Sequence, residues 1–147
     1  MRFFDALLPS EADALVQAGD ENALRRALEL EPNRADAAVA LARLLHERGE
    51  SDAALELLGN VSGSFAADGL AARIRLERDP ELAAAFAALD AGELQRGLDA
   101  LIGAIAANGD GERREDLRRA VVGVLDDLGV EHPLSRESRR KLASALY

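Results

Sequence analysis

The sequence contains no cysteine and no tryptophan, and only 3% of its residues are aromatic. Without cysteine the chain has no disulfide, no thiolate metal site and no cysteine nucleophile. Because 48% of the residues are hydrophobic but so few are aromatic, the core has to be built from alanine and leucine. Such side chains suit closely packed helices better than strands, which favour aromatic and β-branched residues.

Long apolar runs and an excess of positive charge are also missing. No run approaches the roughly 18 residues that are needed to cross a bilayer, and Met1-Arg2-Phe3-Phe4 is too short to be a signal peptide. We therefore expect a cytoplasmic protein. The net charge of −9 argues against nucleic acid as a partner, because phosphates would be repelled.

Residues with catalytic or metal-binding chemistry are scarce. The two histidines are His46, which lacks the second histidine of a zinc-protease helix, and His132, which precedes a proline. The segment Asn108-Gly109-Asp110-Gly111 lacks the glycine and the closing glutamate of a calcium loop, so we interpret it as a turn. The sequence therefore predicts no enzyme activity, no metal and no cofactor.

Residues 34–58 predict two short amphipathic helices joined by a tight turn. Apolar residues recur at helical spacing in the first helix, and Gly49 is expected to end it because glycine adopts the left-handed conformation easily. Ser51 or Asp52 is expected to cap the second helix. The spacing of small and large residues matches a tetratricopeptide repeat at Ala42, Gly49, Ala54 and Leu58.

Degraded copies of this pattern flank the central pair. Upstream, Gly19 and the residues after it resemble Gly49 and its successors; downstream, the four positions recur as Ala85, Gly92, Gly97 and Leu101. The glycines are separated by about 30 and then about 43 residues, against about 34 in a regular array, so the second interval is expected to hold an extra helix.

These patterns predict an all-α, tetratricopeptide-like helix-pair solenoid of about nine helices with a C-terminal capping helix. Residues 1–9 form a linker-like segment, and residues 10–147 form the helical domain. The expected helices run from Ser10 to about Ala18, from Asp20 to Leu30, through the central pair, from about Leu70 to Arg78, from Asp79 to Asp90, from Glu93 to Ala106, from Glu112 to Leu128, and from Pro133 onward.

The first helix of each pair in such a solenoid lines a concave groove. The register on Ala42 and on Ala85 predicts that the groove is lined by Asp36, Val39, Arg43, His46 and Glu47, and then by Asp79, Leu82, Phe86, Leu89 and Asp90. Leu82, Phe86 and Leu89 form an apolar patch, which is either open to a protein partner or filled by a neighbouring helix.

The last fifteen residues have a charge opposite to that of the rest. They contain four basic residues and one acidic residue, so they carry +3 and leave −12 for the remainder. Their apolar stripe, Leu142, Ala145 and Leu146, fastens the last helix to a neighbour or to a partner. The helix is thus either a docking element or a solenoid cap.

The C-terminal residues also resemble a particular family. Arg139-Arg140-Lys141-Leu142-Ala143-Ser144-Ala145-Leu146-Tyr147, with the upstream Asp126-Asp127-Leu128-Gly129 and His132-Pro133-Leu134, resembles the closing segment of the thioredoxin-like co-chaperones called chaperedoxins (YbbN or CnoX). Leu8-Pro9-Ser10 is similar to the join that follows that family's thioredoxin domain. This chain has no such domain and no cysteine, so redox activity does not follow.

The resemblance implies a helical module that holds unfolding or oxidised client proteins and passes them to the chaperones GroEL or DnaK. The partner-binding residues expected from the patch and the tail are Leu82, Phe86, Leu89, Arg139, Arg140, Lys141, Leu142, Leu146 and Tyr147. The alternative is a tetratricopeptide scaffold in an unrelated complex, without a chaperone role.

Overall fold

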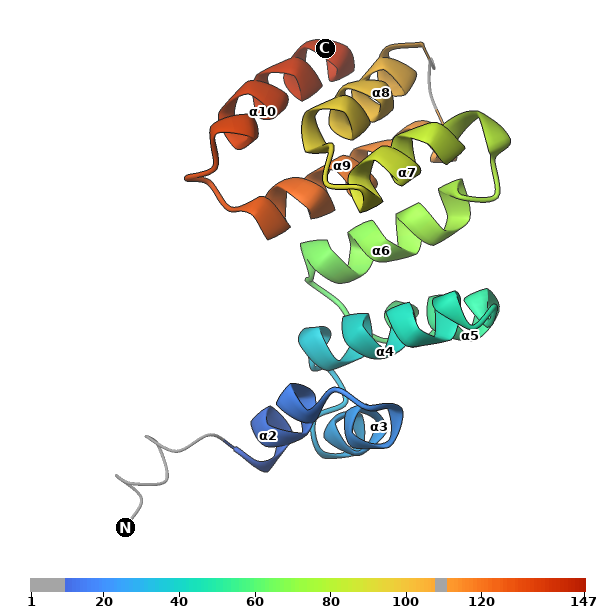
Figure 1. The fold of residues 1–147 in the computed structure, drawn as a ribbon, viewed down its shortest axis with the longest axis vertical. Helices are drawn as coiled ribbons and strands as arrows, with labels where there is room; N and C mark the ends of the chain where they lie inside the picture. The colour runs from blue at the N-terminus through green and yellow to red at the C-terminus, as the bar shows by residue number, and fades with distance from the viewer. Residues whose placement is uncertain (1–9, 108–110) are drawn as a thin grey trace. The chain divides into compact units, whose positions relative to one another are not determined.

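A computed structural model describes residues 10–107 and 111–147, and every regular element in these residues is a helix (Figure 1). The predicted linker at residues 1–9 and most of the predicted turn at Asn108–Gly111 lie outside them. The described residues form nine α-helices and one 3-10 turn: α2 (Glu11–Ala18), α3 (Glu21–Leu30), α4 (Ala35–Glu47), α5 (Ser51–Gly59), α6 (Phe65–Leu76), η1 (Pro80–Leu82), α7 (Ala83–Asp90), α8 (Leu94–Ala107), α9 (Glu112–Leu128) and α10 (Pro133–Leu146). The predicted all-α class and helix number are confirmed.

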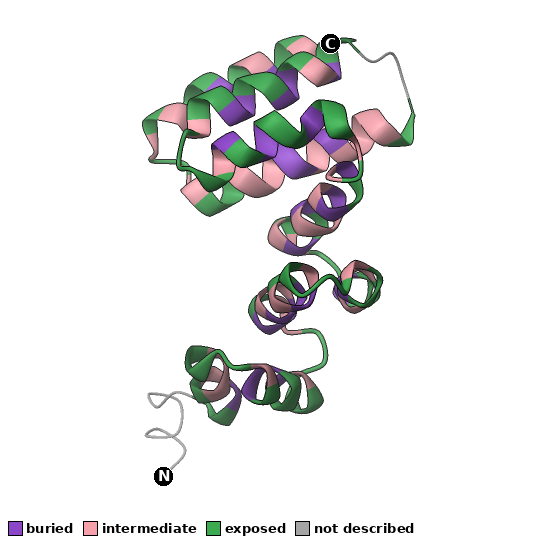
Figure 2. Cartoon of the chain, turned by 45° about the vertical axis from the view of Figure 1, so that its right-hand side comes forward, coloured by how far each residue is buried: buried purple, intermediate pink, exposed green. Residues whose placement is uncertain are grey.

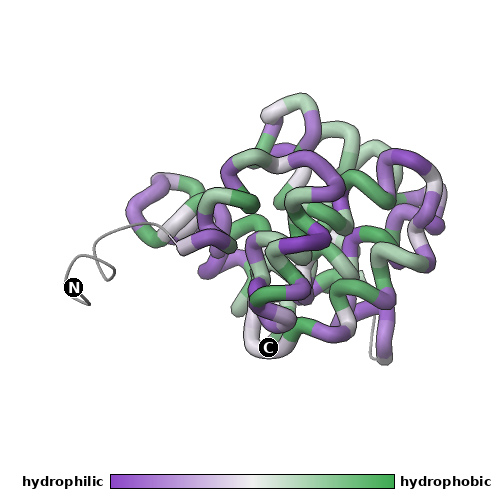
Figure 3. The backbone as a smooth tube through the Cα atoms, turned by 90° about the horizontal axis from the view of Figure 1, so that it is seen from below, coloured by the Kyte–Doolittle hydropathy of each residue, from purple (hydrophilic) through white to green (hydrophobic). Residues whose placement is uncertain are grey.

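Contacts between residues divide the chain into two compact units, Met1–Ala67 and Asp68–Tyr147. Helix α6 begins at the end of the first unit and lies mostly in the second. That residues 10–147 act as one domain stays a prediction. Hydrophilic and hydrophobic residues alternate along the chain, as the hydropathy of the backbone tube shows (Figure 3).

In the first unit consecutive helices pack on one another, from α2 to α5. Ser10 and Asp13 form a capping box at the start of α2, and the side chain of Asp20 accepts a hydrogen bond from the amide of Ala23 at the start of α3, so both predicted starts are confirmed. Small and large side chains are buried together: Ala38 and Ala42 are inaccessible to solvent, and so are Leu24 and Leu41. Buried residues follow one side of each helix (Figure 2).

The turn between α4 and α5 follows the predicted backbone but not the predicted cap. Gly49 has φ of +87°, and the Glu50 amide donates to the carbonyl of Leu45 at 2.8 Å. The turn places Glu50 at the N-cap position of α5, where its side chain accepts no hydrogen bond from the first turn of the helix. Ser51 and Asp52 already lie inside the helix, so the prediction that one of them is the cap is wrong. The Ser51 hydroxyl lies 2.8 Å from Nδ1 of His46 instead.

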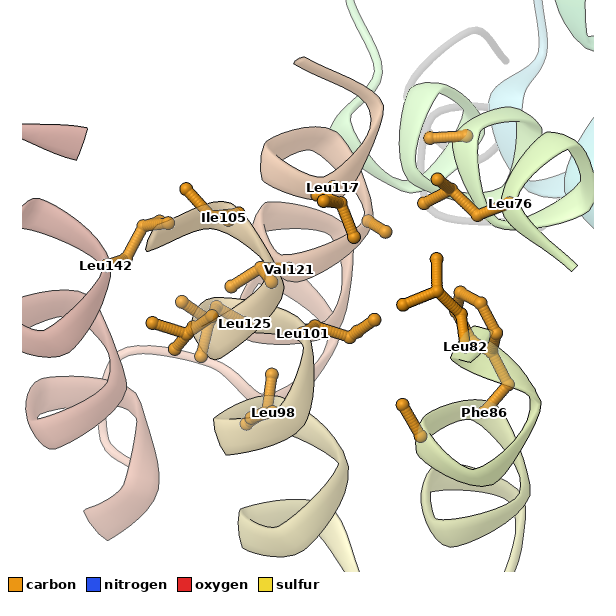
Figure 4. Close-up of a cluster of buried hydrophobic side chains, with 14 residues drawn as sticks. Leu76, Leu82, Phe86, Leu98, Leu101, Ile105, Leu117, Val121, Leu125 and Leu142 are labelled. Atoms are coloured by element: carbon orange, nitrogen blue, oxygen red, sulfur yellow. The ribbon is translucent and has the colours of Figure 1, made fainter. Parts of the chain in front are cut away.

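In the second unit α8 is the central helix, in contact with α7, α9 and α10 (Figure 1). Its Leu98 and Leu101 lie between side chains of α9 and those of η1 and α7 (Figure 4). The cluster is made mostly of leucine, alanine, isoleucine and valine, and Phe86 is its one aromatic member, as the composition predicted.

Helix α6 is the extra helix predicted between Gly49 and Gly92, but it starts five residues earlier than expected. The Ser64 hydroxyl accepts a hydrogen bond from the amide of Ala67, which caps the first turn. Gly69, which precedes the expected start at about Leu70, lies inside the helix, where a Cβ atom would be 2.8 Å from Cα of Gly123 on α9. The helix that was expected to open at Asp79 begins with the 3-10 turn η1 and becomes α-helical at Ala83.

Candidate interaction surfaces

The small residues of the predicted repeat mark places where helices approach closely. Ala42 and Ala85 are buried, and so are their counterparts Ala54 and Gly97 on the second helix of each pair. A Cβ atom on Gly97 would lie 2.6 Å from the Leu89 side chain and 3.0 Å from the carbonyl oxygen of Ala85. The register inferred from the sequence therefore describes the real contact between α7 and α8.

The predicted apolar patch on α7 is closed. Leu82 and Phe86 are only 4% and 3% exposed and belong to the core cluster, and Leu89 is partly buried against it (Figure 4). The guanidinium of Arg73 lies 5.0 Å from the centre of the Phe86 ring. The interpretation of these residues as an open patch is thus wrong for Leu82 and Phe86, and the alternative, a face filled by neighbouring helices, describes the structure.

Arg73 joins α6 to α7 over this ring. Its Nη2 atom donates to both carboxylate oxygens of Asp90, at 2.7 and 2.8 Å, and its Nε atom donates to Glu77 at 2.7 Å. Burial disfavours the charged form of Arg73, but the hydrogen bonds to Glu77 and Asp90 outweigh it and raise the pKa of the guanidinium. The predicted groove residue Asp90 is therefore used in an ion pair within the unit.

Helix α10 packs on α8 and α9 through a face that begins with two serines. Ser135, Ser138 and Leu142 are buried, and the Ser135 hydroxyl donates to the carbonyl of Gly129 at 2.6 Å. Ala145 and Leu146 are partly buried against the core, in agreement with the predicted stripe. Sequence reasoning missed the serines because they are polar, although their spacing from Leu142 is that of one helix face.

Two polar contacts hold the far end of α10. Nη2 of Arg114, on α9, donates to the carbonyl oxygens of Ala145 and Leu146 at 3.0 and 3.1 Å, which satisfies acceptors that a helix end leaves free. Lys141 pairs with Asp99 on α8 at 3.0 Å and with Glu137 at 3.1 Å. Both acids raise the pKa of the Lys141 ammonium, Asp99 more strongly.

The opposite side of α10 is basic and exposed. Arg136, Arg139 and Arg140, which we call the arginine stripe, are exposed and form no hydrogen bond or ion pair with any described residue. Tyr147 follows α10 and is fully exposed. Of the predicted tail residues, the structure therefore turns Leu142 and Leu146 toward the core and leaves Arg139, Arg140 and Tyr147 accessible.

The predicted groove residues of α4 form no closed site. Asp36, Arg43 and Glu47 are exposed, and Val39 and His46 are partly buried. Asp36 belongs instead to a cluster around Arg34, which pairs with Asp13 at 2.6 Å, Asp36 at 2.8 Å and Glu31 at 2.9 Å. No spacing pattern in the sequence indicated the Asp13 contact, because it joins residues of different helices.

A second ion-pair cluster joins α3 to the end of α4. Glu21 accepts from Arg48 at 2.7 Å and from Arg25 at 2.9 Å, and these two guanidinium groups lower the pKa of the Glu21 carboxyl to about 2. Most ion pairs of the first unit are exposed, so they orient the helices more than they stabilise them.

Both histidines have structural contacts at helix ends. His46 bonds to Ser51 at the end of α4, and Nδ1 of His132 accepts from the amide of Leu134 at the start of α10. His132 also lines an open hollow beside the start of α8, with Glu93, Arg96 and Asp99. No group of three metal-ligating side chains exists in the described residues. Nor is any helix there long and apolar enough to cross a membrane.

Paired amphipathic helices with small residues at the crossings define a repeat-built protein-interaction module. A tetratricopeptide repeat model matches residues 66–147, which is more than half of the chain, so the chain belongs to the tetratricopeptide repeat family. A second tetratricopeptide model matches residues 23–56, whose length is one repeat. No curated protein matches the chain. Tetratricopeptide repeats are a non-catalytic fold, and the chain is a protein–protein interaction module.

Proposed function

We propose that this module belongs to a co-chaperone of the chaperedoxin type, which holds unfolding or oxidised client proteins and docks to GroEL- or DnaK-type chaperones in the cytoplasm. It works without a cofactor and without catalysis. The proposal rests on the resemblance of the C-terminal residues to that family. The observation that supports it is that these residues form a separate helix, α10, whose accessible side carries Arg139 and Arg140 and which the exposed Tyr147 follows.

In this proposal the tail residues have two tasks. Leu142, Leu146 and the paired Lys141 hold α10 on α8 and α9, and the exposed residues meet the chaperone. Leu82 and Phe86 are core residues, so client proteins are held elsewhere than on a preformed patch there. Truncation at Pro133 is a poor test, because it removes Leu142 from the core and destabilises the unit whichever role α10 has.

The first experiment measures whether the chain suppresses the aggregation of a heat-denatured test enzyme, followed by light scattering, and whether immobilised GroEL or DnaK binds it. Suppression together with chaperone binding supports the proposal. A folded chain that does neither overturns it and favours the alternative, a scaffold in an unrelated complex.

A point variant tests the role of the tail. Tyr147→Ser removes a fully exposed aromatic side chain, which is the type of residue that dominates binding energy at interfaces. We expect it to weaken chaperone binding at least tenfold without changing the melting temperature. Val130→Ser is the matched control, since Val130 is also exposed but precedes α10. Equal losses in both variants would contradict a specific contact.

A further inference from the structure

The arginine stripe differs from the other arginines of the chain. Apart from Arg43, every other described arginine has an interaction within the chain. Arg114 donates to backbone carbonyls, Arg78 has an interaction of its own, and each of the others pairs with a carboxylate. Three of the four arginines without such a contact thus lie on one exposed side of one helix. An acidic chain has many carboxylates that could have paired with them, and none of the described ones does.

The geometry of the stripe limits what it can bind. Arg139 and Arg140 follow Arg136 by three and four residues, so both lie next to it on the helix surface. The three span about 6 Å along the helix axis. The acid on α10, Glu137, is engaged by Lys141. A partner therefore meets three cations within about one helical turn, beside the half-exposed Glu137, which pairs with Lys141 and not with the stripe.

We infer that the arginine stripe of the docked α10 binds an acidic helical segment of a protein partner, in which carboxylates three or four residues apart pair with Arg136, Arg139 and Arg140. Guanidinium groups match carboxylates by paired hydrogen bonds, which favours this chemistry. The inference names the face of α10 that contacts the partner. It rests on the proposed function in one respect, that α10 is the helix that meets a partner.

The negative net charge of the chain favours a short acidic protein segment over an extended polyanion as the partner of the arginine stripe. The chain as a whole carries −9, so a nucleic acid or an anionic membrane that extended beyond the stripe would meet repulsion from the rest of the protein. A helix that crosses α10 contacts only the stripe. Complementary charges at this position mainly fix the register and speed the encounter.

The partner also has to bind α10 without removing it. The apolar side of α10 is occupied by α8 and α9, and Lys141 and Arg114 hold it at two further points. A partner that took Leu142 into its own groove would expose the core of the second unit. Binding through the arginine stripe needs no such rearrangement.

The test uses the full chain and a fluorescein-labelled helical peptide of 20 residues. The peptide consists of alanine, with glutamates placed alternately three and four residues apart. Its control is the same peptide with glutamine in place of glutamate. Fluorescence anisotropy at 50 mM NaCl should show binding of the glutamate peptide at least tenfold tighter than that of the glutamine peptide. Binding should weaken strongly at 300 mM NaCl, because exposed charges are screened.

The variant Arg139→Glu/Arg140→Glu should weaken the glutamate peptide at least tenfold. Arg43→Glu/Arg26→Glu is the control of equal charge change, since both residues are exposed and lie in the first unit. Circular dichroism melts establish that each variant is folded. An equal effect in the control pair, an unchanged affinity in the stripe variant, or no difference between the two peptides would each overturn the inference.

Two further measurements separate other outcomes. Hydrogen exchange of residues 133–146 should be unchanged or slower with the peptide bound, and faster exchange would show that α10 is displaced, against the inference. Tighter binding to a single-stranded RNA 20-mer, or to vesicles with one third phosphatidylserine, that is lost in the stripe variant would assign the site to phosphates instead. The peptide assay contains no chaperone, so its result does not depend on whether the chain binds GroEL or DnaK.

Discussion

Replacement of Gly69 by alanine tests the close approach of α6 and α9 in the second unit. A Cβ atom at this position would lie 2.8 Å from Cα of Gly123 and 3.1 Å from the carbonyl oxygen of Arg119, both on α9. These are backbone atoms, so no side chain can rotate away, and the two helices have to separate. Overpacking of this kind costs about 1–3 kcal/mol.

Alanine also favours the helix over glycine by about 0.5–1 kcal/mol, which offsets part of that cost. Gly103 isolates this term, because it lies inside α8 with no atom within 4 Å of an added Cβ. We therefore expect Gly69→Ala to lose about 1 kcal/mol net, and Gly103→Ala to gain about 0.5–1 kcal/mol.

Urea unfolding followed by circular dichroism at 222 nm measures both variants. A difference of about 2 kcal/mol between them moves the midpoint by about 1 M for a domain with a typical urea slope. If Gly69→Ala is as stable as Gly103→Ala, α6 and α9 do not meet at Gly69 and Gly123, and the reasoning is refuted.

Three other residues give shorter tests. Phe86→Ala should lower the free energy of unfolding by about 3–5 kcal/mol, because it truncates a buried aromatic side chain. Phe65→Ala, at an exposed site, should change it by less than about 0.5 kcal/mol in urea unfolding. A similarly small loss for Phe86→Ala would show that Phe86 is exposed and would support the open patch. NMR titration should give Glu21 a pKa of about 2 in the native chain and a value nearer 4.5 in Arg48→Gln. Because the folded pKa is depressed, the pairing of Glu21 stabilises the fold above about pH 4.5 and is lost as the pH falls toward 2; equal titration midpoints would contradict the ion pair. Arg114→Gln should speed hydrogen exchange in the last turn of α10, and unchanged exchange would show that the Arg114 contact is not formed in solution.

Helix boundaries were predictable from the sequence where the cap residue is local. Ser10, Asp20 and Gly49 act within three or four residues of their own positions, and the structure has helix ends there. The start of α6 was predicted too late, at about Leu70, which left the glycine at position 69 outside the expected helix. That glycine serves the approach to α9, a contact that lies more than fifty residues away in the sequence.

Surface assignment was less predictable than the helices. The spacing that placed Leu82 and Phe86 on one face of a helix was right, but one sequence pattern cannot tell a face that lines a groove from a face that α6 and α8 cover. On α10 the apolar stripe was visible, whereas Ser135 and Ser138 extend the buried face with polar residues. Periodicity identifies faces, and only packing decides which of them are open.

The contacts of α10 also set a cost for any partner that competes for its apolar side. Removing Leu142 from the core resembles the truncation of a buried leucine, at about 2–5 kcal/mol, before the contacts of Lys141 and Arg114 are counted. At about 3 kcal/mol only about one molecule in a hundred has α10 released, and a partner of the released helix binds about a hundredfold more weakly than its intrinsic affinity. A partner of the arginine stripe meets α10 as it lies and has no such loss. The two modes therefore respond in opposite ways to Arg114→Gln, which should tighten binding through the released helix and leave binding through the stripe unchanged.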